Sequence, residues 1–369
     1  MHILHSEAAT GWGGQEIRIF QESQLLLARG HQVSIICQPG SPLEERCRTI
    51  NDSRFHLYPI RMNGTLSIPS FLALYRRIAA TRPHLLHTHS SIDSWQVSFC
   101  GKLLSIPIVR SRHVSIPVHN FFPRNLVYSY FPDRIITSGE TIRSMITSLS
   151  GVSAERVVPV AAGVDMERFD PEISGDRIRQ ELNLAPDQPL IGKVGVIRGW
   201  KGHDFFLDAV PWVLEKFPKA CFVIVGAGPG YEQIRQRIKD QAMDSAVSML
   251  GHREDIPEIM AALNILVLAS ISGEATSQVI PQAFAMKTPV IGTRAGGIPE
   301  ILGDGDRGIL AEVKSSTGLA EGIITILQHP DRGSELAAKA FSYCREELTA
   351  AKMMNKTIAV YEDLLNSKL

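Results

Sequence analysis

The sequence predicts an α/β protein built from two tandem doubly wound, Rossmann-like domains, each with a parallel sheet and helices on both faces. Short apolar runs alternate with longer helical patterns in two separate stretches, which is typical of parallel sheets covered by helices. The chain also has 369 residues, more than one hydrophobic core usually serves. We therefore expect two domains of ordinary size.

The first stretch of alternation covers residues 1 to about 160. Its apolar runs have the period of buried strands, and the longer segments between them have the period of helices. The expected strands are residues 2–5, 32–37, 85–87, 107–110 and 134–137, and the expected helices are 15–29, 71–82 and 95–104.

A second alternation begins at residue 190. Its expected strands are residues 190–196, 220–225, 248–250, 265–268 and 290–292, and its expected helices are 205–217, 231–241, 256–262 and 282–286. The polar stretch 161–184 lies between the two alternations and predicts an interdomain connection with a boundary near residue 170. The expected domains are 1–168 and 169–345, followed by a helical segment, 346–369, that could cross back to the first domain. Residues 336–369 as a whole are expected to form one continuous helix.

Composition excludes several functions. Lys plus Arg equals Asp plus Glu at 38 each, so no global basic charge predicts nucleic-acid binding. The five cysteines are scattered without zinc or disulfide spacing, which indicates reduced thiols. The sequence enters a strand at His2 without a signal-peptide pattern, and no apolar run is long enough to span a bilayer. We therefore expect a cytoplasmic protein.

The segment 274–282 carries the most information about function. It opens a helix with Pro281 in the first turn, where proline is best tolerated. Unpaired N–H groups at a helix start, expected here near residues 277–280, favour a phosphate or diphosphate. Glu274 precedes the helix and Gln282 lies inside it, so the two side chains should contact opposite ends of one extended ligand. This pattern predicts a nucleotide-sugar site.

Two cations follow the first strand of the second half, where a doubly wound sheet presents ligands. Arg198 offers a planar fork and Lys201 a compact charge, which together suit two phosphate groups. A solvated basic loop is the plain alternative. The glycine turn 294–300 and the helix start at Ser277 are expected at the same edge of the sheet, which favours a phosphate site.

Two glycine-rich turns also follow strands. In the turn 11–16, Gly13 and Gly14 either let another molecule approach the backbone or merely form the turn. The turn 226–230 is similar to a dinucleotide fingerprint, but its third glycine comes too early and no acidic residue follows at the usual distance. We interpret 226–230 as a plain strand-to-helix turn.

Three histidines lie at expected strand ends: His87 and His89 after one strand, and His113 after the next. Imidazoles gathered in this way suggest a metal ion. No Asp, Glu or Cys accompanies His113 at short spacing, and nothing supplies a fourth ligand with a metal-site spacing. We therefore predict no metal and interpret these histidines as the polar lining of a cleft.

The aromatic-rich stretch 117–131 has two interpretations. It could be a loop that faces an acceptor or a membrane, since aromatic side chains favour that interface. A helix packed by its aromatic side is the alternative, and we favour it slightly.

In their order and spacing, these motifs resemble the retaining, nucleotide-sugar-dependent glycosyltransferases of the GT-B fold, in the family-four group that builds lipopolysaccharide, capsule and glycolipids. The resemblance covers nearly the whole chain. It rests on the segments 13–16, 87–89, 111–113, 163–169, 200–203, 226–229, 250–257, 274–282 and 296–300. It implies two domains facing each other across a cleft, with the acceptor bound by the first and the donor by the second.

The resemblance also implies roles for individual residues. Arg198 and Lys201 would neutralise the donor diphosphate, and Glu274 would hold hydroxyls of the donor sugar. His113 would lie beside the transferred sugar. The remaining donor contacts would come from Gly13, Gly14, Thr276, Ser277, Gln278, Val279 and Gln282.

The sequence departs from the family pattern at several of these positions. Gln282 stands where the family has a second glutamate, so it can hydrogen-bond the nucleotide ribose without a charge. Thr276 and Ser277 replace an aromatic–glycine pair, and Ala162 replaces a common asparagine. These changes fall at positions that bear on the choice of donor.

The predicted reaction is sugar transfer from a UDP-, GDP- or ADP-linked donor to a saccharide or lipid-linked acceptor, with retention and with no metal or cofactor. Its expected setting is the biosynthesis of cell-surface polysaccharide or glycolipid, with transient contact at the inner face of the membrane. A glycoside hydrolase is disfavoured because no second carboxylate partners Glu274. The alternatives left open are a sugar-nucleotide epimerase or phosphorylase on the same fold, and a noncatalytic nucleotide-sugar-binding protein.

Overall fold

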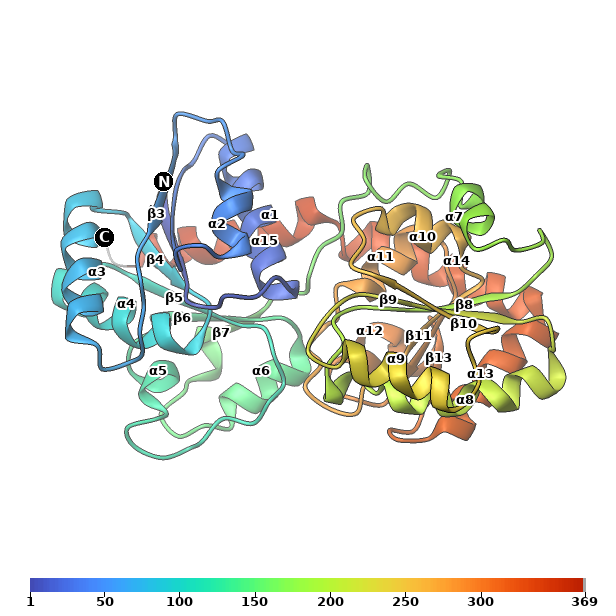
Figure 1. Cartoon of the computed structure of the whole chain (residues 1–369). Coiled ribbons are helices and arrows are strands. Elements are labelled where there is room, and N and C mark those ends of the chain that lie inside the picture. The colour runs from blue at the N-terminus through green and yellow to red at the C-terminus, as the bar shows by residue number, and fades with distance from the viewer. Residues whose placement is uncertain (368–369) are drawn as a thin grey trace. The chain divides into compact units, whose positions relative to one another are not determined.

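A computed structural model describes residues 1–367, and Figure 1 shows its ribbon. The chain forms two compact units, each built around its own sheet. Unit 1 contains Met1–Ala161 and the segment from Ala351 onward, and unit 2 contains Ala162–Ala350.

Unit 1 is built on a seven-stranded parallel sheet with the order β3-β2-β1-β4-β5-β6-β7. All of its strand pairings are parallel. The order runs outward in both directions from β1 and β4, as in a doubly wound sheet. The strands are β1 (His2–Glu7), β2 (Gln32–Cys37), β3 (Phe55–Pro59), β4 (Leu85–Thr88), β5 (Ile108–Arg112), β6 (Arg134–Thr137) and β7 (Val157–Pro159).

Helices cover both faces of this sheet. Ile3 packs with α1, α2 and α15, whereas the next residue, Leu4, packs with α3 and α4, because side chains alternate across a strand. The helices are α1 (Gly14–Ala28), α2 (Pro42–Cys47), α3 (Ile68–Thr81), α4 (Ser91–Leu104), α5 (Leu126–Ser129), α6 (Glu140–Thr147), the 3₁₀ turn η1 (Ala154–Arg156) and α15 (Ala350–Asn366).

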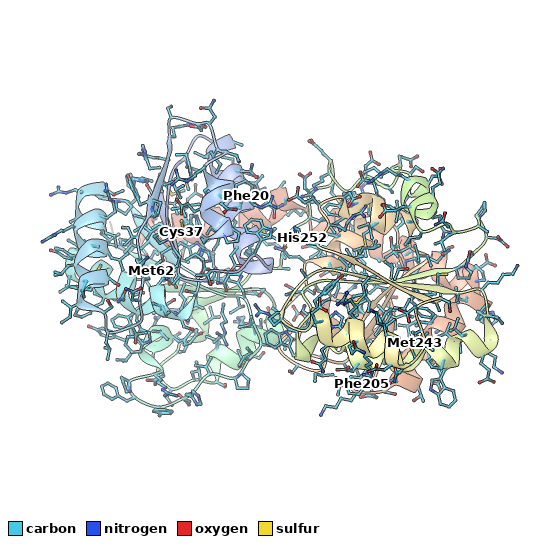
Figure 2. All side chains as sticks on the ribbon, viewed as in Figure 1. Phe20, Cys37, Met62, Phe205, Met243 and His252 are labelled. Carbon is cyan, nitrogen blue, oxygen red and sulfur yellow. The ribbon has the colours of Figure 1, made fainter. Side chains whose placement is uncertain are left out.

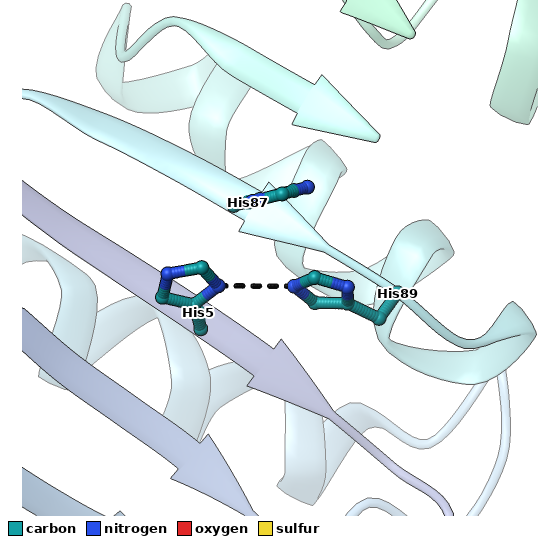
Figure 3. Close-up of side chains that lie close together, drawn as sticks. All are labelled: His5, His87 and His89. Atoms are coloured by element: carbon teal, nitrogen blue, oxygen red, sulfur yellow. Dashed lines mark hydrogen bonds between the residues drawn. The ribbon is translucent and has the colours of Figure 1, made fainter. Parts of the chain in front are cut away.

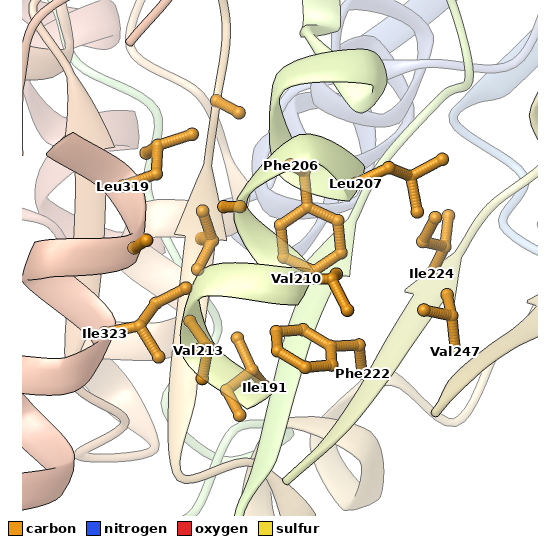
Figure 4. Packing of buried hydrophobic residues seen from close by; sticks show 14 of the residues in the cluster. Ile191, Phe206, Leu207, Val210, Val213, Phe222, Ile224, Val247, Leu319 and Ile323 are labelled. Carbon is orange, nitrogen blue, oxygen red and sulfur yellow. The ribbon is translucent and has the colours of Figure 1, made fainter. Parts of the chain in front are cut away.

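Unit 2 has a six-stranded parallel sheet with the order β10-β9-β8-β11-β12-β13. Its core packs Phe206 of α8 against Phe222 of β9, with ring centroids 5.8 Å apart and nearly perpendicular planes (Figure 4). The strands are β8 (Leu190–Val194), β9 (Cys221–Val225), β10 (Val247–Gly251), β11 (Ile265–Leu268), β12 (Val290–Thr293) and β13 (Ile309–Ala311).

The helices of unit 2 follow its strands in alternation. They are α7 (Asp176–Glu181), η2 (Gly199–Lys201), α8 (His203–Lys216), α9 (Tyr231–Asp240), α10 (Ile256–Ala262), α11 (Val279–Ala285), α12 (Ile298–Leu302), η3 (Gly303–Gly305), α13 (Ser316–Gln328) and α14 (Pro330–Glu347). The predicted fold class, two doubly wound α/β domains in tandem, is therefore confirmed.

The structure adds elements that periodicity did not predict: the strands β3, β7 and β13 and the helices α2, α6, α7, α12 and α13. The three strands are at sheet edges, and their residues are mostly half-buried. An edge strand with three to five residues and partial burial lacks the apolar run that marks a central strand.

The connection between the units differs from the predicted one. The polar stretch 161–184 contains the helix α7, and the units separate between Ala161 and Ala162 rather than near residue 170. Val164 donates its N–H to the Leu348 carbonyl at 2.7 Å and accepts the Ala350 N–H at 2.8 Å. These bonds hold the start of unit 2 to its end.

The same contacts explain why the expected helix over residues 336–369 is two helices. The chain leaves helical geometry between α14 and α15 at Leu348 and Thr349, where its backbone bonds to Val164 instead. A side chain at Gly163 would lie 2.7 Å from the Ala350 Cα, so only glycine allows this approach. The second helix, α15, then packs in unit 1 through Tyr361.

The turn Gly226–Gly230 packs against the loop that follows β8. A Cβ on Gly226 would lie 2.0 Å from the Gly195 carbonyl oxygen, and one on Gly228 would lie 2.5 Å from that of Ile197. Both glycines have positive φ values. Close packing therefore accounts for them, in agreement with the interpretation as a plain turn.

All five cysteines are free, and four of them, including Cys37 (Figure 2), are buried. Burial raises the pKa of the Cys37 thiol to about 12, which keeps it protonated. Within residues 1–367, none of the helices has the length and apolarity needed to cross a bilayer.

Candidate active site

A short, largely buried polar contact in unit 2 joins the loops that follow β8 and β11. The Lys201 ammonium lies 2.5 Å from Glu274 Oε1, and the Ser270 hydroxyl donates to the same oxygen at 2.6 Å. Glu274 is 5% exposed. The two loops meet because β8 and β11 are parallel neighbours, whose carboxyl ends lie at one edge of the sheet.

Gly202 allows this approach. It has a φ of +65°, and a Cβ there would lie 1.8 Å from the Ala269 carbonyl oxygen. The Ile271 N–H donates to the Trp200 carbonyl at 2.8 Å. The turn carrying Lys201 is thus fixed against the end of β11, so its ammonium is held in place before any ligand arrives.

The predicted glycine turn also reaches this edge of the sheet. The Gly297 N–H donates to the Glu274 carbonyl at 3.3 Å. A Cβ on Gly297 would lie 2.8 Å from the Ala275 carbonyl oxygen. The structure therefore brings the turn before α12 together with the segment that follows β11, as the sequence predicted.

The helix after Glu274 begins three residues before the expected span 282–286. α11 has seven residues, with Gln278 at its N-cap, Pro281 in its first turn and Gln282 half-buried at its fourth position. The expectation of unpaired amides through Ile280 is wrong at Ile280, whose N–H donates to the Ser277 carbonyl at 3.1 Å. Thr276 is buried, and Ser277 and Val279 are half-buried.

Arg198 lies apart from the Lys201–Glu274 pair. Its side chain is exposed, and its guanidinium carbon lies 5.3 Å from the centre of the Trp200 ring. Across residues 1–367 the structure gives Arg198 no ion pair. The sequence grouped Arg198 with Lys201 because of their spacing, but the turn directs the two side chains to different surroundings.

Lys193 is a buried cation that the sequence analysis missed. It lies on β8, is 4% exposed, and interacts electrostatically with Lys201 and Glu274. Burial, followed by repulsion from Lys201, lowers the pKa of Lys193 to about 7. The signal was a lysine inside the apolar run 190–194, where a charged side chain is unusual.

His203, the first residue of α8, is the neighbour of this lysine pair. It is 3% exposed, and neither ring nitrogen has a hydrogen-bond partner among the described residues. Burial and the charges of Lys193 and Lys201 lower the pKa of His203, so it is neutral. The positive charge at this site therefore resides on the two lysines.

In unit 1, the glycine turn begins α1. The Gly13 N–H donates to Glu16 Oε2 at 2.8 Å, which caps the helix. Gly13 has an extended backbone, and a Cβ there would meet only Glu16, at 3.5 Å, so helix geometry does not demand glycine. Gly14 is the first residue of α1. A glycine that helix geometry does not require agrees with close approach by another molecule.

Glu7, at the end of β1, holds the start of this turn and was not predicted. Its carboxylate is fully buried, accepts the Ala9 N–H at 2.7 Å and accepts a hydrogen bond from the Gln15 amide. Burial and the nearby Asp93 carboxylate raise the pKa of Glu7 well above that of an ordinary glutamate.

The predicted histidines of unit 1 are joined by a fourth, His5 of β1. His5 Nδ1 lies 3.0 Å from His89 Nε2 (Figure 3), and His89 Nδ1 lies 3.1 Å from His113 Nε2. His113 is half-buried at the end of this chain. Burial lowers the pKa of each imidazole, which leaves all of them neutral near pH 7.

His87 is held separately. Its Nδ1 lies 2.7 Å from the Tyr361 hydroxyl of α15, and its Nε2 lies 2.8 Å from the Ser111 hydroxyl. His5, His87 and His89 have ring nitrogens close enough to share an ion. Five of these six nitrogens already have a hydrogen-bond partner, however, and only His5 Nε2 lacks one in the described part of the chain. This pattern is that of a polar network.

Comparisons with known proteins agree with the two-unit architecture. The family described as "Glycosyltransferase Family 4" matches residues 12–168, and the one described as "Glycosyl transferases group 1" matches residues 188–329. The chain belongs to glycosyltransferase family four. Each match falls on one of the two sheets, and together they include the segments that carry the glycine turn and the Lys201–Glu274 pair.

Individual relatives align over almost the whole length of this glycosyltransferase. The N-acetyl-alpha-D-glucosaminyl L-malate synthase of Bacillus anthracis is 25% identical, covering 96% of this chain and 94% of the relative. The UDP-Gal:alpha-D-GlcNAc-diphosphoundecaprenol alpha-1,3-galactosyltransferase of Escherichia coli is 23% identical, covering 99% and 98%. Anabaena HepE, crystallised with UDP-glucose, is 20% identical with a TM-score of 0.85 over all of both chains, which shows the shared GT-B fold.

Proposed function

We propose that this glycosyltransferase moves a sugar from a nucleotide-diphosphate-sugar donor to a saccharide or lipid-linked acceptor, with retention of anomeric configuration. The Lys201–Glu274 contact carries the proposal. It places a cation and a sugar-binding carboxylate together at the carboxyl ends of adjacent parallel strands, where open α/β sheets bind their ligands.

The charges of the site suit a diphosphate. Glu274 neutralises one of the two lysines, so Lys193 and Lys201 together leave an excess of positive charge on this edge of unit 2. The donor diphosphate becomes more negative as the glycosidic bond breaks, and fixed positive charge stabilises that change. We assign this role to Lys201 and Lys193, with exposed Arg198 available to a distal phosphate. No metal is needed in this scheme.

Glu274 serves to hold the donor sugar. Its Oε1 is occupied by Lys201 and Ser270, so Oε2 is the atom available to sugar hydroxyls. A carboxylate already bonded to an ammonium and a hydroxyl is a poor nucleophile. This supports transfer on one face of the sugar: the bond from C1 to the phosphate oxygen breaks, the acceptor oxygen bonds to C1, and its proton passes to the departing phosphate.

The remaining predicted donor contacts retain their assigned roles. The backbone of Ser277, Gln278 and Val279, next to buried Thr276, meets the phosphates, and Gln282 on α11 hydrogen-bonds the ribose. In unit 1, Gly13 and Gly14 are assigned to close approach of the donor, and a Cβ on Gly13 would meet only Glu16. Neutral His113 is assigned to hydrogen-bond the transferred sugar and to position the acceptor hydroxyl.

The choice of substrates follows the relatives as a proposal. The names of the Escherichia coli relative and of the Anabaena complex both contain a UDP-sugar. UDP-sugars are therefore the first donors to test, followed by GDP- and ADP-sugars. The Escherichia coli name also contains a diphosphoundecaprenol acceptor, which supports a lipid-linked acceptor and a role in cell-surface polysaccharide or glycolipid synthesis.

The test is a panel of UDP-, GDP- and ADP-sugars, each with and without saccharide and lipid-diphosphate acceptors, in the presence of EDTA. We expect acceptor-dependent nucleotide release, and a product whose anomeric coupling in proton NMR matches that of the donor. An inverted product would contradict retention. Conversion of the donor without acceptor would indicate an epimerase, and binding without turnover throughout would indicate a noncatalytic protein.

A further inference from the structure

Unit 1 exposes large apolar side chains where α3 begins. Leu66 is 92% exposed, Ile68 is 70% exposed and Leu72 is 44% exposed. Ile68 and Leu72 are four residues apart on α3 and therefore lie on one face of it. Isolated exposed leucines are ordinary, but three within seven residues form a local apolar face.

The neighbouring helix α4 extends this face. Phe99 and Leu103 are also four residues apart, and they are 48% and 56% exposed. The rings of Phe71 on α3 and Phe99 on α4 lie 5.5 Å apart, so the exposed sides of the two helices are continuous. Figure 1 shows α3 and α4 side by side on one face of the unit 1 sheet.

The aromatic stretch 117–131 continues the same surface. Trp95 of α4 contacts Phe131, and Phe131 contacts Tyr130, with ring centroids 5.5 Å apart in both pairs. Tyr130 is 63% exposed. The sequence favoured a packed helix here, but α5 covers only Leu126–Ser129 and the aromatic side chains before it are exposed.

Two adjacent phenylalanines in this stretch are also exposed. Phe122 is 78% exposed and Phe121 is 50% exposed, and the Arg124 guanidinium carbon lies 5.2 Å from the Phe121 ring centre. An aromatic ring beside a guanidinium is stable in water and also suits the headgroup region of a bilayer. We call α3, α4 and residues 113–131 together the apolar surface of unit 1.

The charge of this region is one-sided. Residues 60–131 contain eight Lys or Arg residues and a single acidic residue, Asp93, although the whole chain is neutral. Asp93 is buried and accepts hydrogen bonds from Ser6 and Ser90, so it does not contribute negative charge at the surface. Arg61, Arg76 and Arg124 are exposed.

We propose that the apolar surface of unit 1 docks on an anionic lipid bilayer. Exposed aromatic and aliphatic side chains would enter the headgroup region, while the arginines around them would contact lipid phosphates. Aromatic side chains and arginine are the residue types that a bilayer interface favours. A second copy of the chain fits less well, because it would place one cationic region against another.

The experiment measures flotation of the full chain with two kinds of vesicle. Neutral vesicles contain phosphatidylcholine alone, and anionic vesicles contain phosphatidylcholine with about 30 mol% phosphatidylglycerol. One double variant, Phe121→Ser with Phe122→Ser, removes apolar contacts from a loop. A second, Arg76→Gln with Arg124→Gln, removes charge. The matched controls in unit 2 are Trp212→Ser, at a residue 54% exposed, and Arg332→Gln, at an exposed arginine.

The expected result is that the natural chain floats with the anionic vesicles but not with phosphatidylcholine alone. Each double variant should lower the partition coefficient by roughly tenfold or more, and raising the salt concentration should weaken binding. The controls should bind like the natural chain. Circular dichroism melts check that every variant is folded.

Three results would overturn the proposal. The natural chain could remain unbound with anionic vesicles, or Trp212→Ser could reduce binding as much as the loop variant does. Light scattering could also show a dimer that the Phe121→Ser, Phe122→Ser variant converts to a monomer. The vesicles contain neither donor nor acceptor, so the outcome does not depend on the proposed sugar transfer.

Discussion

Lys201 Nζ lies 2.5 Å from Glu274 Oε1, although 73 residues separate them in the sequence. The side chain of Glu274 is 6% exposed and that of Lys201 is 20% exposed. A buried ion pair gives little net stability, because desolvation of both charges offsets their attraction. The arrangement is therefore better explained by ligand chemistry than by folding.

Glu274→Gln should lower kcat/KM by roughly 10²- to 10³-fold, since it removes the charge that holds Lys201 in position and weakens the sugar contact. The chain should remain folded because the two side chains have nearly the same size. Steady-state kinetics with the active donor provide the measurement. The matched control is Glu321→Gln, at an exposed residue of α13. If Glu274→Gln transferred sugar with unchanged kcat/KM, the assignment of this site would be wrong.

Lys193→Met should stabilise unit 2. The pKa of Lys193 is about 7 in the folded chain and 10.5 as an ordinary lysine, so the unfolded chain binds more protons between these values. The free energy of unfolding of the natural chain should therefore rise with pH across this window, and Lys193→Met should lack that rise. At pH 7 the variant should be more stable by about 2–4 kcal/mol, measured by urea unfolding.

Binding of a nucleoside diphosphate should reverse this loss of protonation. A nearby diphosphate raises the pKa of Lys193, so the natural chain should take up a proton on binding at about pH 8. Calorimetry in two buffers of different ionisation enthalpy measures that uptake. The Lys193→Met variant should bind the nucleoside diphosphate more weakly and should take up no proton on binding. If the variant retained the proton uptake, the group that takes up the proton would not be Lys193.

Gly202→Ala should destabilise unit 2 by about 2 kcal/mol or more, because the added methyl group would collide with the Ala269 carbonyl and because φ is positive. Gly199→Ala is the matched control in the same turn, since a Cβ there meets nothing within 4 Å. Gly199→Ala should change the free energy of unfolding by no more than about 1 kcal/mol. Equal losses in the two variants, measured by thermal unfolding, would contradict the packing argument.

His113→Ala should lower kcat by roughly 10²- to 10⁴-fold while leaving nucleoside diphosphate affinity unchanged. Because burial depresses the pKa of His5, His89 and His113, activity should show no step from these residues between about pH 5 and 8. Nitrogen NMR of the imidazoles should find one tautomer throughout. His329→Ala, at an exposed residue, is the control. If His5, His89 or His113 titrated near pH 6.5, that result would contradict the burial argument.

Much of the fold was predictable because central parallel strands are buried on both faces and therefore appear as apolar runs. The expected strands 134–137 and 265–268 match β6 and β11 in full. Edge strands were missed because one side of each lacks a neighbour, as for β3 and β13. The break between α14 and α15 was also missed, because it depends on backbone bonds to Val164, far away in the sequence.

The site was predicted in part. The sequence placed Lys201 and Glu274 after strands at the same edge of the second sheet. The structure shows that these strands are neighbours and brings the two side chains into contact. Close spacing in the sequence grouped Arg198 with Lys201. In the structure, however, the turn between them directs the Arg198 side chain toward the Trp200 ring. Spacing gives the position of a residue along the chain, whereas the direction of its side chain depends on backbone angles within the turn.

The sequence by itself determined the class of the protein: the alternation of strands and helices, the glycine turns and the ordered motifs of glycosyltransferase family four. Only the tertiary structure decided which polar groups became buried together, as for Lys193 beside Lys201 and for Glu7 beside Asp93. Desolvation and charge interactions depend on distance in space. A local pattern along the chain therefore predicts where a side chain occurs, and the packed fold sets its protonation and its partners.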